Sequence, residues 1–172
     1  MSRAFVKEAD GEQAETDLPD RPVSPGPNYV TPRGLRLLQS QVEQLRSQLG
    51  TLKDRDDLEA RNARKQIERD LRYFETQLRR AIPVPPPPAG EESVRFGATV
   101  TLRDEEGKPL EVTLVGEDEA DPARGLISWS SPLGRELIGK GIGDEVRWRR
   151  PAGEQLLEIE SVRYPVLENG DS

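Results

Sequence analysis

The first half of the chain repeats apolar residues at the spacing of a coiled coil. Between residues 31 and 52 the apolar positions step by three or four residues, which places them along one side of an α-helix. These positions are Leu35, Leu38, Val42, Leu45, Leu49 and Leu52. Thr31 followed by Pro32 predicts the start of this helix, because a threonine hydroxyl caps free N–H groups and proline suits the first helical position.

A second apolar series follows and predicts a second helix: Ala60, Ala63, Ile67, Leu71, Phe74 and Leu78. In an antiparallel hairpin the numbers of facing residues have a constant sum. Four pairs of this chain add up to 112: Leu52 with Ala60, Leu49 with Ala63, Leu45 with Ile67, and Leu38 with Phe74. The pattern therefore predicts a hairpin domain over residues 30–82, with its tip near Asp56 in the acidic stretch 54–59.

The second half of the chain changes to short alternating or β-branched runs separated by Gly, Asp and Pro turns. The prolines of the stretch 83–90 end the second helix and predict a stiff linker. The runs that follow predict five strands, and Ser131 with Pro132 predicts the start of one helix. The expected fold class is α+β, with the antiparallel two-helix hairpin followed by an antiparallel sheet packed on one helix in residues 91–166 and a tail over 167–172.

Composition narrows the possible functions. The chain of 172 residues has no cysteine and no histidine, which excludes thiol or imidazole catalysis and zinc sites of the usual kind. Only carboxylates remain for a metal, and they favour Mg²⁺ or Mn²⁺. The net charge of −7 argues against nonspecific duplex binding. Residues 1–29 are acidic and poor in apolar residues, so we expect a disordered leader of a soluble cytoplasmic protein without a membrane segment.

The stretch "SPLGRELIGKGIGDEVRWRRPAGEQLLEIESVRY", residues 131–164, resembles the GreA/GreB family of bacterial transcription elongation factors. The stretch "YVTPRGLRLLQSQVEQL" resembles the opening helix of that family, so the resemblance covers roughly residues 29–164. It implies an FKBP-like C-terminal domain. It also implies a monomeric accessory factor, not itself an enzyme, that binds RNA polymerase at the secondary channel and inserts the hairpin.

In this family, an Asp and a Glu three positions apart at the tip help to hold a Mg²⁺ ion shared with the polymerase active centre, so that backtracked transcripts are cleaved. Two alignments place this pair differently in our chain. By spacing, Asp56 and Glu59 match the pair. By the Asp-Leu dipeptide, Asp57 matches the aspartate, but Ala60 then stands in the place of the glutamate. A third interpretation is that these charges only solvate an exposed helical turn.

The resemblance also implies two binding surfaces. Basic side chains of the second arm would face the nascent RNA: Arg61, Arg64, Lys65, Arg69 and Arg72. Charges at the flanking positions of a coiled coil explain them equally well. The segment of Ser130, Ser131 and Pro132 would face the polymerase, although Ser131 and Pro132 are also ordinary helix-start residues.

Two alternatives to a cleavage factor follow from the same sequence. Both arms are about one heptad shorter than the family pattern, which shortens the reach by roughly 10 Å. This difference leaves open a regulator that occupies the secondary channel without promoting cleavage. The FKBP-like domain alone would suit a prolyl isomerase or chaperone, but the region after residue 90 offers few aromatic side chains for such a pocket.

Overall fold

The computed structural model describes residues 17–165 and divides into two compact units. Within the described part, the hairpin unit holds residues 17–26 and 37–80, and the sheet unit holds residues 27–36 and 81–165. The first 16 residues of the expected leader and the expected tail lie outside the described residues.

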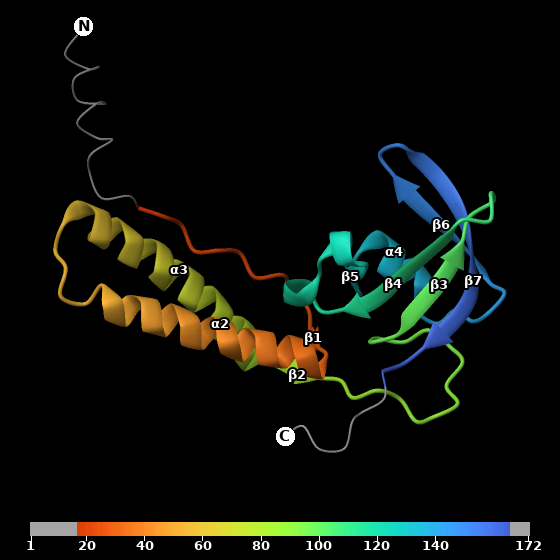
Figure 1. Cartoon of the computed structure of the whole chain (residues 1–172), viewed down its shortest axis with the longest axis horizontal. Coiled ribbons are helices and arrows are strands. Elements are labelled where there is room, and N and C mark those ends of the chain that lie inside the picture. Colours follow the sequence, from red (N-terminus) through yellow and green to blue (C-terminus); the bar gives the residue numbers. More distant parts are fainter. Residues whose placement is uncertain (1–16, 166–172) are drawn as a thin grey trace, which may run out of the picture. The chain divides into compact units, whose positions relative to one another are not determined.

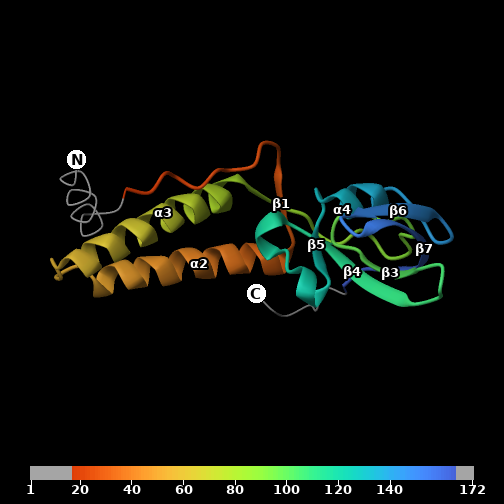
Figure 2. The same ribbon diagram turned by 90° about the horizontal axis from the view of Figure 1, so that it is seen from above.

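The hairpin unit confirms the predicted pair of helices. Helix α2 (Pro32–Thr51) and helix α3 (Leu58–Arg80) lie side by side and run in opposite directions (Figures 1 and 2). Of the twelve apolar residues predicted to face the partner helix, eight are half-buried and four are buried: Leu38, Val42, Leu45 and Ala60. An ion pair also joins the arms, with Arg46 Nη2 lying 3.0 Å from Glu75 Oε1.

One buried position of α3 is polar and was not predicted. Gln77 is only 1% exposed, although its side chain carries an amide. Burial of an amide is costly unless its polar atoms are hydrogen-bonded. Arg80 Nη1 donates to Gln77 Oε1 at 3.1 Å, which satisfies the carbonyl oxygen. The apolar periodicity could not reveal this position, because a glutamine carries no hydrophobic signal.

The start of α2 belongs to the sheet unit and has the predicted cap. The backbone N–H of Gly34 donates to Thr31 Oγ1 at 2.9 Å. The carboxylate of Glu119 lies beside this cap, with 5% of its side chain exposed, in the 3₁₀ turn η1 (Glu117–Glu119). It accepts hydrogen bonds from the Thr31 hydroxyl and, at 2.9 Å, from Arg33 Nη1. Glu119 therefore fixes the first turn of α2 to the sheet unit.

The sheet unit is built on five strands in the order β5-β4-β3-β7-β6. Their bounds are β3 (Thr99–Arg103), β4 (Pro109–Val115), β5 (Leu126–Ser128), β6 (Glu145–Arg150) and β7 (Gly153–Arg163). All neighbours pair antiparallel except β4 and β5, which pair parallel. The α+β class is thus confirmed, but the sheet is mixed and not purely antiparallel as predicted. The connection 116–125, including η2 (Pro122–Arg124), carries the chain back before β5 begins, so β5 runs parallel to β4.

The core of this unit lies between the sheet and helix α4 (Pro132–Leu137). Leu133 and Leu137 of the helix are buried with apolar residues from the strands and the loop before β3: Val94, Ala98, Val100, Leu102, Val112, Leu114, Val146, Leu157 and Ile159. Ile138 shares the sequence pattern of Leu133 and Leu137 but is 40% exposed. The helix ends at Leu137, so Ile138 takes an extended conformation and leaves the buried face.

A second, two-stranded sheet forms where the hairpin segment leaves and re-enters the sheet unit. Strand β1 (Asn28–Val30) pairs parallel with β2 (Ala81–Pro83). The Tyr29 ring packs edge-on against Trp129, with 5.1 Å between the centroids. These two strands depend on pairing with each other, which no local pattern encodes, so their residues were predicted to belong to the leader, the hairpin and the linker.

Candidate functional site

The tip of the hairpin is the loop 52–57 between α2 and α3, and Asp57 is part of its structure. Asp57 Oδ2 accepts a hydrogen bond of 3.2 Å from the backbone N–H of Ala60 and so caps α3. The Arg55 guanidinium donates to both carboxylate oxygens, at 3.1 and 2.9 Å. The hydrogen bond from Arg55 lowers the pKa of Asp57 to about 2, with the Ala60 N–H acting in the same direction. Asp57 is therefore engaged in folding the tip.

Asp56 and Glu59 differ from Asp57, because neither caps a helix. The Asp56 side chain is 93% exposed, and its Oδ1 lies 3.5 Å from Arg61 Nη1. Glu59 is also exposed and lies in the first turn of α3. The carboxylates that the two alignments select therefore differ in the structure. Asp57 is engaged in the cap of α3, whereas Asp56 and Glu59 are exposed to solvent.

The tip carboxylates fit partial ligation of a hard cation. Two exposed carboxylates supply the oxygen ligands that Mg²⁺ prefers and leave most coordination positions to water or other groups. Within residues 17–165, no group of three or more acidic side chains is arranged to hold a metal ion. A Mg²⁺ ion held by Asp56 and Glu59 would therefore depend on ligands from elsewhere.

Two of the predicted RNA-contacting arginines stabilise the tip loop. Arg64 Nη1 donates to the carbonyl oxygens of Leu52 and Arg55, both at 2.6 Å. The Leu52 carbonyl follows the end of α2, where backbone acceptors lack helical partners. Arg61 Nη1 donates to the Asp56 carbonyl oxygen at 2.8 Å. Both guanidinium groups thus hold the backbone that presents the carboxylates.

The other predicted basic residues lie farther along α3 and contact residues 17–20. Lys65 Nζ lies 3.4 Å from Asp17 Oδ1, and Arg72 Nη2 lies 2.8 Å from Asp20 Oδ1. Arg69 Nε donates to the Pro19 carbonyl oxygen at 2.7 Å. Sequence analysis placed residues 17–20 in a disordered leader and did not anticipate this contact.

The predicted polymerase-facing segment forms a compact turn before α4. Ser131 Oγ accepts from the Gly134 N–H at 3.1 Å and donates to the Ser128 carbonyl at 2.6 Å. The Ser130 hydroxyl lies 2.9 Å from Ser128 Oγ. Pro132 is exposed. The serine hydroxyls thus shape the turn, and Pro132 presents an apolar surface.

Two exposed isoleucines follow α4 in the chain. Ile138 and Ile142 are 40% and 60% exposed, and no other large hydrophobics between residues 83 and 165 are so exposed. Sequence analysis did not select them. The glycine-rich stretch 139–143 was the available signal, because an isoleucine between glycines has few neighbours that could bury it.

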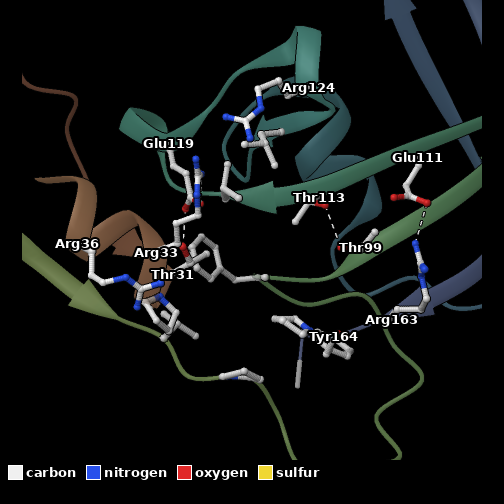
Figure 3. Close-up of a pocket in the computed structure, with 18 residues that line it drawn as sticks. Thr31, Arg33, Arg36, Thr99, Glu111, Thr113, Glu119, Arg124, Arg163 and Tyr164 are labelled. Atoms are coloured by element: carbon white, nitrogen blue, oxygen red, sulfur yellow. Dashed lines mark hydrogen bonds and ion pairs between the residues drawn. The ribbon is translucent and has the colours of Figure 1, made fainter. Parts of the chain in front are cut away.

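A cleft of about 760 Å³ lies within the sheet unit (Figure 3). Arg33 and Arg163 at its wall are paired with carboxylates, Arg163 with Glu111 at 2.7 Å. Arg36 and Arg124 also line it, and within residues 17–165 their guanidinium groups have no hydrogen-bond or ion-pair partner.

The cleft has few of the aromatic side chains expected of a prolyl isomerase pocket. Phe96 and Tyr164 are the only aromatic residues among the described lining. The Tyr164 hydroxyl already accepts from the Arg95 N–H at 2.9 Å and donates to the Ser93 carbonyl. The described lining thus lacks the several convergent aromatic side chains that a prolyl isomerase pocket needs.

No helix in the described part of the chain is both long and apolar enough to cross a membrane. Comparison with known families matches residues 89–164 to the family described as "Transcription elongation factor, GreA/GreB, C-term".

Individual relatives extend the similarity to most of the chain. The transcription elongation factor GreA of Sphingopyxis alaskensis is 35% identical over 74% of this chain and 81% of its own length. The transcription elongation factor GreB of Pseudomonas aeruginosa is 33% identical over 84% of this chain and 95% of its own. Among solved structures, the GreA factor homolog 1 (Gfh1) of Thermus thermophilus is 26% identical, with a TM-score of 0.40, over 80% of this chain and 99% of its own.

Proposed function

Because the chain belongs to the GreA/GreB family of transcription elongation factors, we propose that it is an accessory factor that stimulates transcript cleavage by RNA polymerase. In this proposal the protein binds at the secondary channel as a monomer and inserts its hairpin tip. The bond-breaking chemistry belongs to the polymerase. This chain supplies carboxylates to the active centre and a surface for docking.

The main support for the proposal is the solvent exposure of the Asp56 side chain at the tip. Its side chain is 93% exposed, while neighbouring Asp57 is committed to the helix cap. Asp56 and Glu59 would hold a Mg²⁺ ion together with ligands of the polymerase. Such an ion lowers the pKa of a bound water and so supplies a nucleophile for phosphodiester hydrolysis.

The tip loop favours this role because it is held by its own arginines. Arg64 donates hydrogen bonds to the carbonyl oxygens of Leu52 and Arg55, and Arg61 donates to that of Asp56. A carboxylate presented by a constrained backbone loses less freedom when it binds an ion than one on an unconstrained chain. The other basic residues predicted to face RNA, Lys65, Arg69 and Arg72, would attract the nascent RNA.

Docking would use the exposed apolar surface around α4. Pro132, Ile138 and Ile142 expose apolar side chains on the sheet unit. The Ser130 and Ser131 hydroxyls hold the turn that presents Pro132. This surface combines apolar contact area with a defined backbone, which suits a specific protein interface.

A transcript-cleavage assay on backtracked elongation complexes tests the proposal. The double variant Asp56→Asn/Glu59→Gln should lower stimulation at least about tenfold, the scale seen for disturbed metal sites. It should still compete with the wild-type protein for the polymerase. Asp54→Asn is the matched control, because it removes another exposed tip carboxylate and should leave stimulation unchanged. Equal cleavage by the double variant and the wild type would contradict the assignment.

The length of the arms supports one alternative, a regulator that occupies the channel without promoting cleavage. Helices of 20 and 23 residues are roughly 30 to 35 Å long. Catalytic groups must be placed within about 1 Å, so a tip that stops short of the active centre cannot assist cleavage. The same assay separates the two roles, because such a regulator would compete with a cleaving factor and give no cleavage of its own.

A further inference from the structure

Residues 17–26 lie extended along one side of α3, within the hairpin unit (Figures 1 and 2). Their contacts follow the helix in order. Asp17 meets Lys65, the Pro19 carbonyl meets Arg69, and Asp20 meets Arg72. Farther on, the Ser24 and Gly26 carbonyls accept from Arg80 Nη2. We call residues 17–26 the strap.

The geometry of the helix explains why these contacts form a continuous track. Lys65, Arg69, Arg72 and Arg80 lie within roughly a quarter of the helix circumference at 100° per residue. The helix advances roughly 22 Å from Lys65 to Arg80 at 1.5 Å per residue. An extended strap of this length reaches up to roughly 30 Å. The strap can therefore match every basic position of the track without strain.

Arg21 fixes the register of the strap on the helix. Its guanidinium lies 4.0 Å from the centroid of the Tyr73 ring, in cation–π geometry. Its Nη1 also lies 3.3 Å from Asp70 Oδ1, and its side chain is 32% exposed. The strap thus places its arginine at Asp70, beside the basic track, and its carboxylates at basic residues of the track. This two-way charge complementarity selects one alignment.

The strap is held by contacts that a stronger polyanion can replace. The Asp17 side chain is fully exposed and that of Asp20 is 71% exposed. Ion pairs this exposed are individually weak and screened by salt. A nucleic-acid strand carries a phosphate at every nucleotide. Its negative charges are therefore more closely spaced than those of the strap, and they can bind the same basic residues.

We propose that the strap is a built-in competitor that covers the basic track of α3 until the phosphate backbone of an RNA strand displaces it. The choice of RNA as the displacing strand rests on the proposed function. The strap is joined directly to β1, so its high local concentration makes it an effective competitor despite weak contacts. RNA binds the basic track only when its contacts with these residues are stronger than those of the strap.

Fluorescence anisotropy with a labelled 12-nucleotide oligouridylate measures this competition in the full chain. Asp17→Asn/Asp20→Asn removes both strap carboxylates that pair with the track. At low salt it should bind the oligonucleotide at least about fivefold more tightly than the wild type, because the competing chain is weakened. Glu105→Gln/Glu106→Gln is the matched control, since it changes the net charge equally at exposed positions of the sheet unit. The control should bind like the wild type.

A spin label reports the strap directly. The chain has no cysteine, so Ser24→Cys provides a single labelling site, and the Ser24 contact with Arg80 uses only the backbone carbonyl. The label should broaden the amide signals of α3 around Arg80. Addition of the oligouridylate should restore them as the strap leaves the helix.

Three outcomes would overturn the inference: equal RNA affinity of the strap variant and its control, RNA binding that leaves the label on α3, or no RNA binding by any variant. The cleavage assay keeps this failure separate from failure of the proposed function. Stimulation that depends on Asp56 and Glu59 would stand even if the strap did not compete with RNA. Conversely, if Asp56→Asn/Glu59→Gln had no effect on cleavage, the measured displacement of the strap by RNA would be unchanged.

Discussion

Neighbouring carboxylates at the tip have different roles because their hydrogen-bond partners differ. Asp57 has both a backbone N–H and the Arg55 guanidinium within hydrogen-bond distance, whereas the Asp56 carboxylate extends into solvent. The sequence alone left open which aspartate corresponds to the family's acidic pair, since spacing favoured Asp56 and the Asp-Leu dipeptide favoured Asp57. Side-chain geometry distinguishes the two aspartates, because Asp57 caps α3 and the Asp56 side chain is 93% exposed. The assignment of the acidic pair stays a prediction.

The low pKa of Asp57 predicts a defined acid sensitivity. Its pKa is about 2 in the folded chain, below its ordinary value of 3.8, so its contribution to stability is present above pH 4 and is lost as the pH falls towards 2. Asp57→Asn keeps a good capping residue but cannot titrate. We expect its thermal midpoint to fall less steeply than that of the wild type between pH 4 and pH 2. Parallel slopes in thermal unfolding curves would contradict this assignment.

Gly134 predicts a second residue-scale effect, at the turn before α4. A Cβ at this position would lie 2.4 Å from the Ser128 carbonyl oxygen and 2.8 Å from that of Trp129. Both are backbone atoms, so the turn itself must shift. Gly134→Ala should therefore destabilise the chain by about 1 to 3 kcal/mol.

Gly50→Ala is the matched control for this prediction. Gly50 lies in α2 with open space around it, so alanine should be neutral or should stabilise the helix by up to about 1 kcal/mol. Chemical denaturation of both variants measures the difference. Equal unfolding free energies of the two variants would contradict the prediction, because the turn would then accept the added Cβ without loss of stability.

At the scale of elements, the hairpin depends on a few buried apolar side chains. Leu45 is 8% exposed, so Leu45→Asp would place an unpaired charge between the helices and should cost more than about 3 kcal/mol. Leu37 lies on the same helix but is 42% exposed, so Leu37→Asp should change stability little. Circular dichroism during thermal unfolding compares the two variants. Unchanged helicity and midpoint in Leu45→Asp would contradict the packing of the hairpin.

Elements with a repeating pattern were predictable from the sequence, and elements fixed by distant contacts were not. The two arms and strands β3, β4, β6 and β7 carry many residues in one period, so their positions were predicted closely, and the three residues of β5 lie within a short apolar run. Strands β1 and β2 have three residues each and depend on each other. The strap depends on charges of α3 that are 48 to 56 positions away in the chain, as with Lys65 and Arg80. No local pattern encodes such pairings, which is also why the buried Glu119 was missed.

At the scale of the whole molecule, the sheet unit should bind RNA polymerase without the hairpin. Its core is complete without residues 37–80, and it includes Tyr29, which packs on Trp129. A chain with residues 37–80 replaced by a short Gly/Ser linker should fold, bind the polymerase and fail to stimulate cleavage. Binding is measured by competition with the full chain, after thermal unfolding has shown a cooperative transition. Loss of binding by this folded variant would place the docking surface in the hairpin.

The pairing of β1 with β2 also bears on how this family can vary. The chain leaves at Val30 and returns at Pro83, which are partners in the register of one small sheet. The residues between them form an insertion whose two ends are fixed by this pairing. Equal additions or deletions in both arms preserve the pairing of the facing residues. Each added or removed heptad changes the length of the hairpin by roughly 10 Å. A change in one arm alone would misalign the facing apolar residues. Hairpin length can therefore change in whole heptads while the sheet unit keeps its fold.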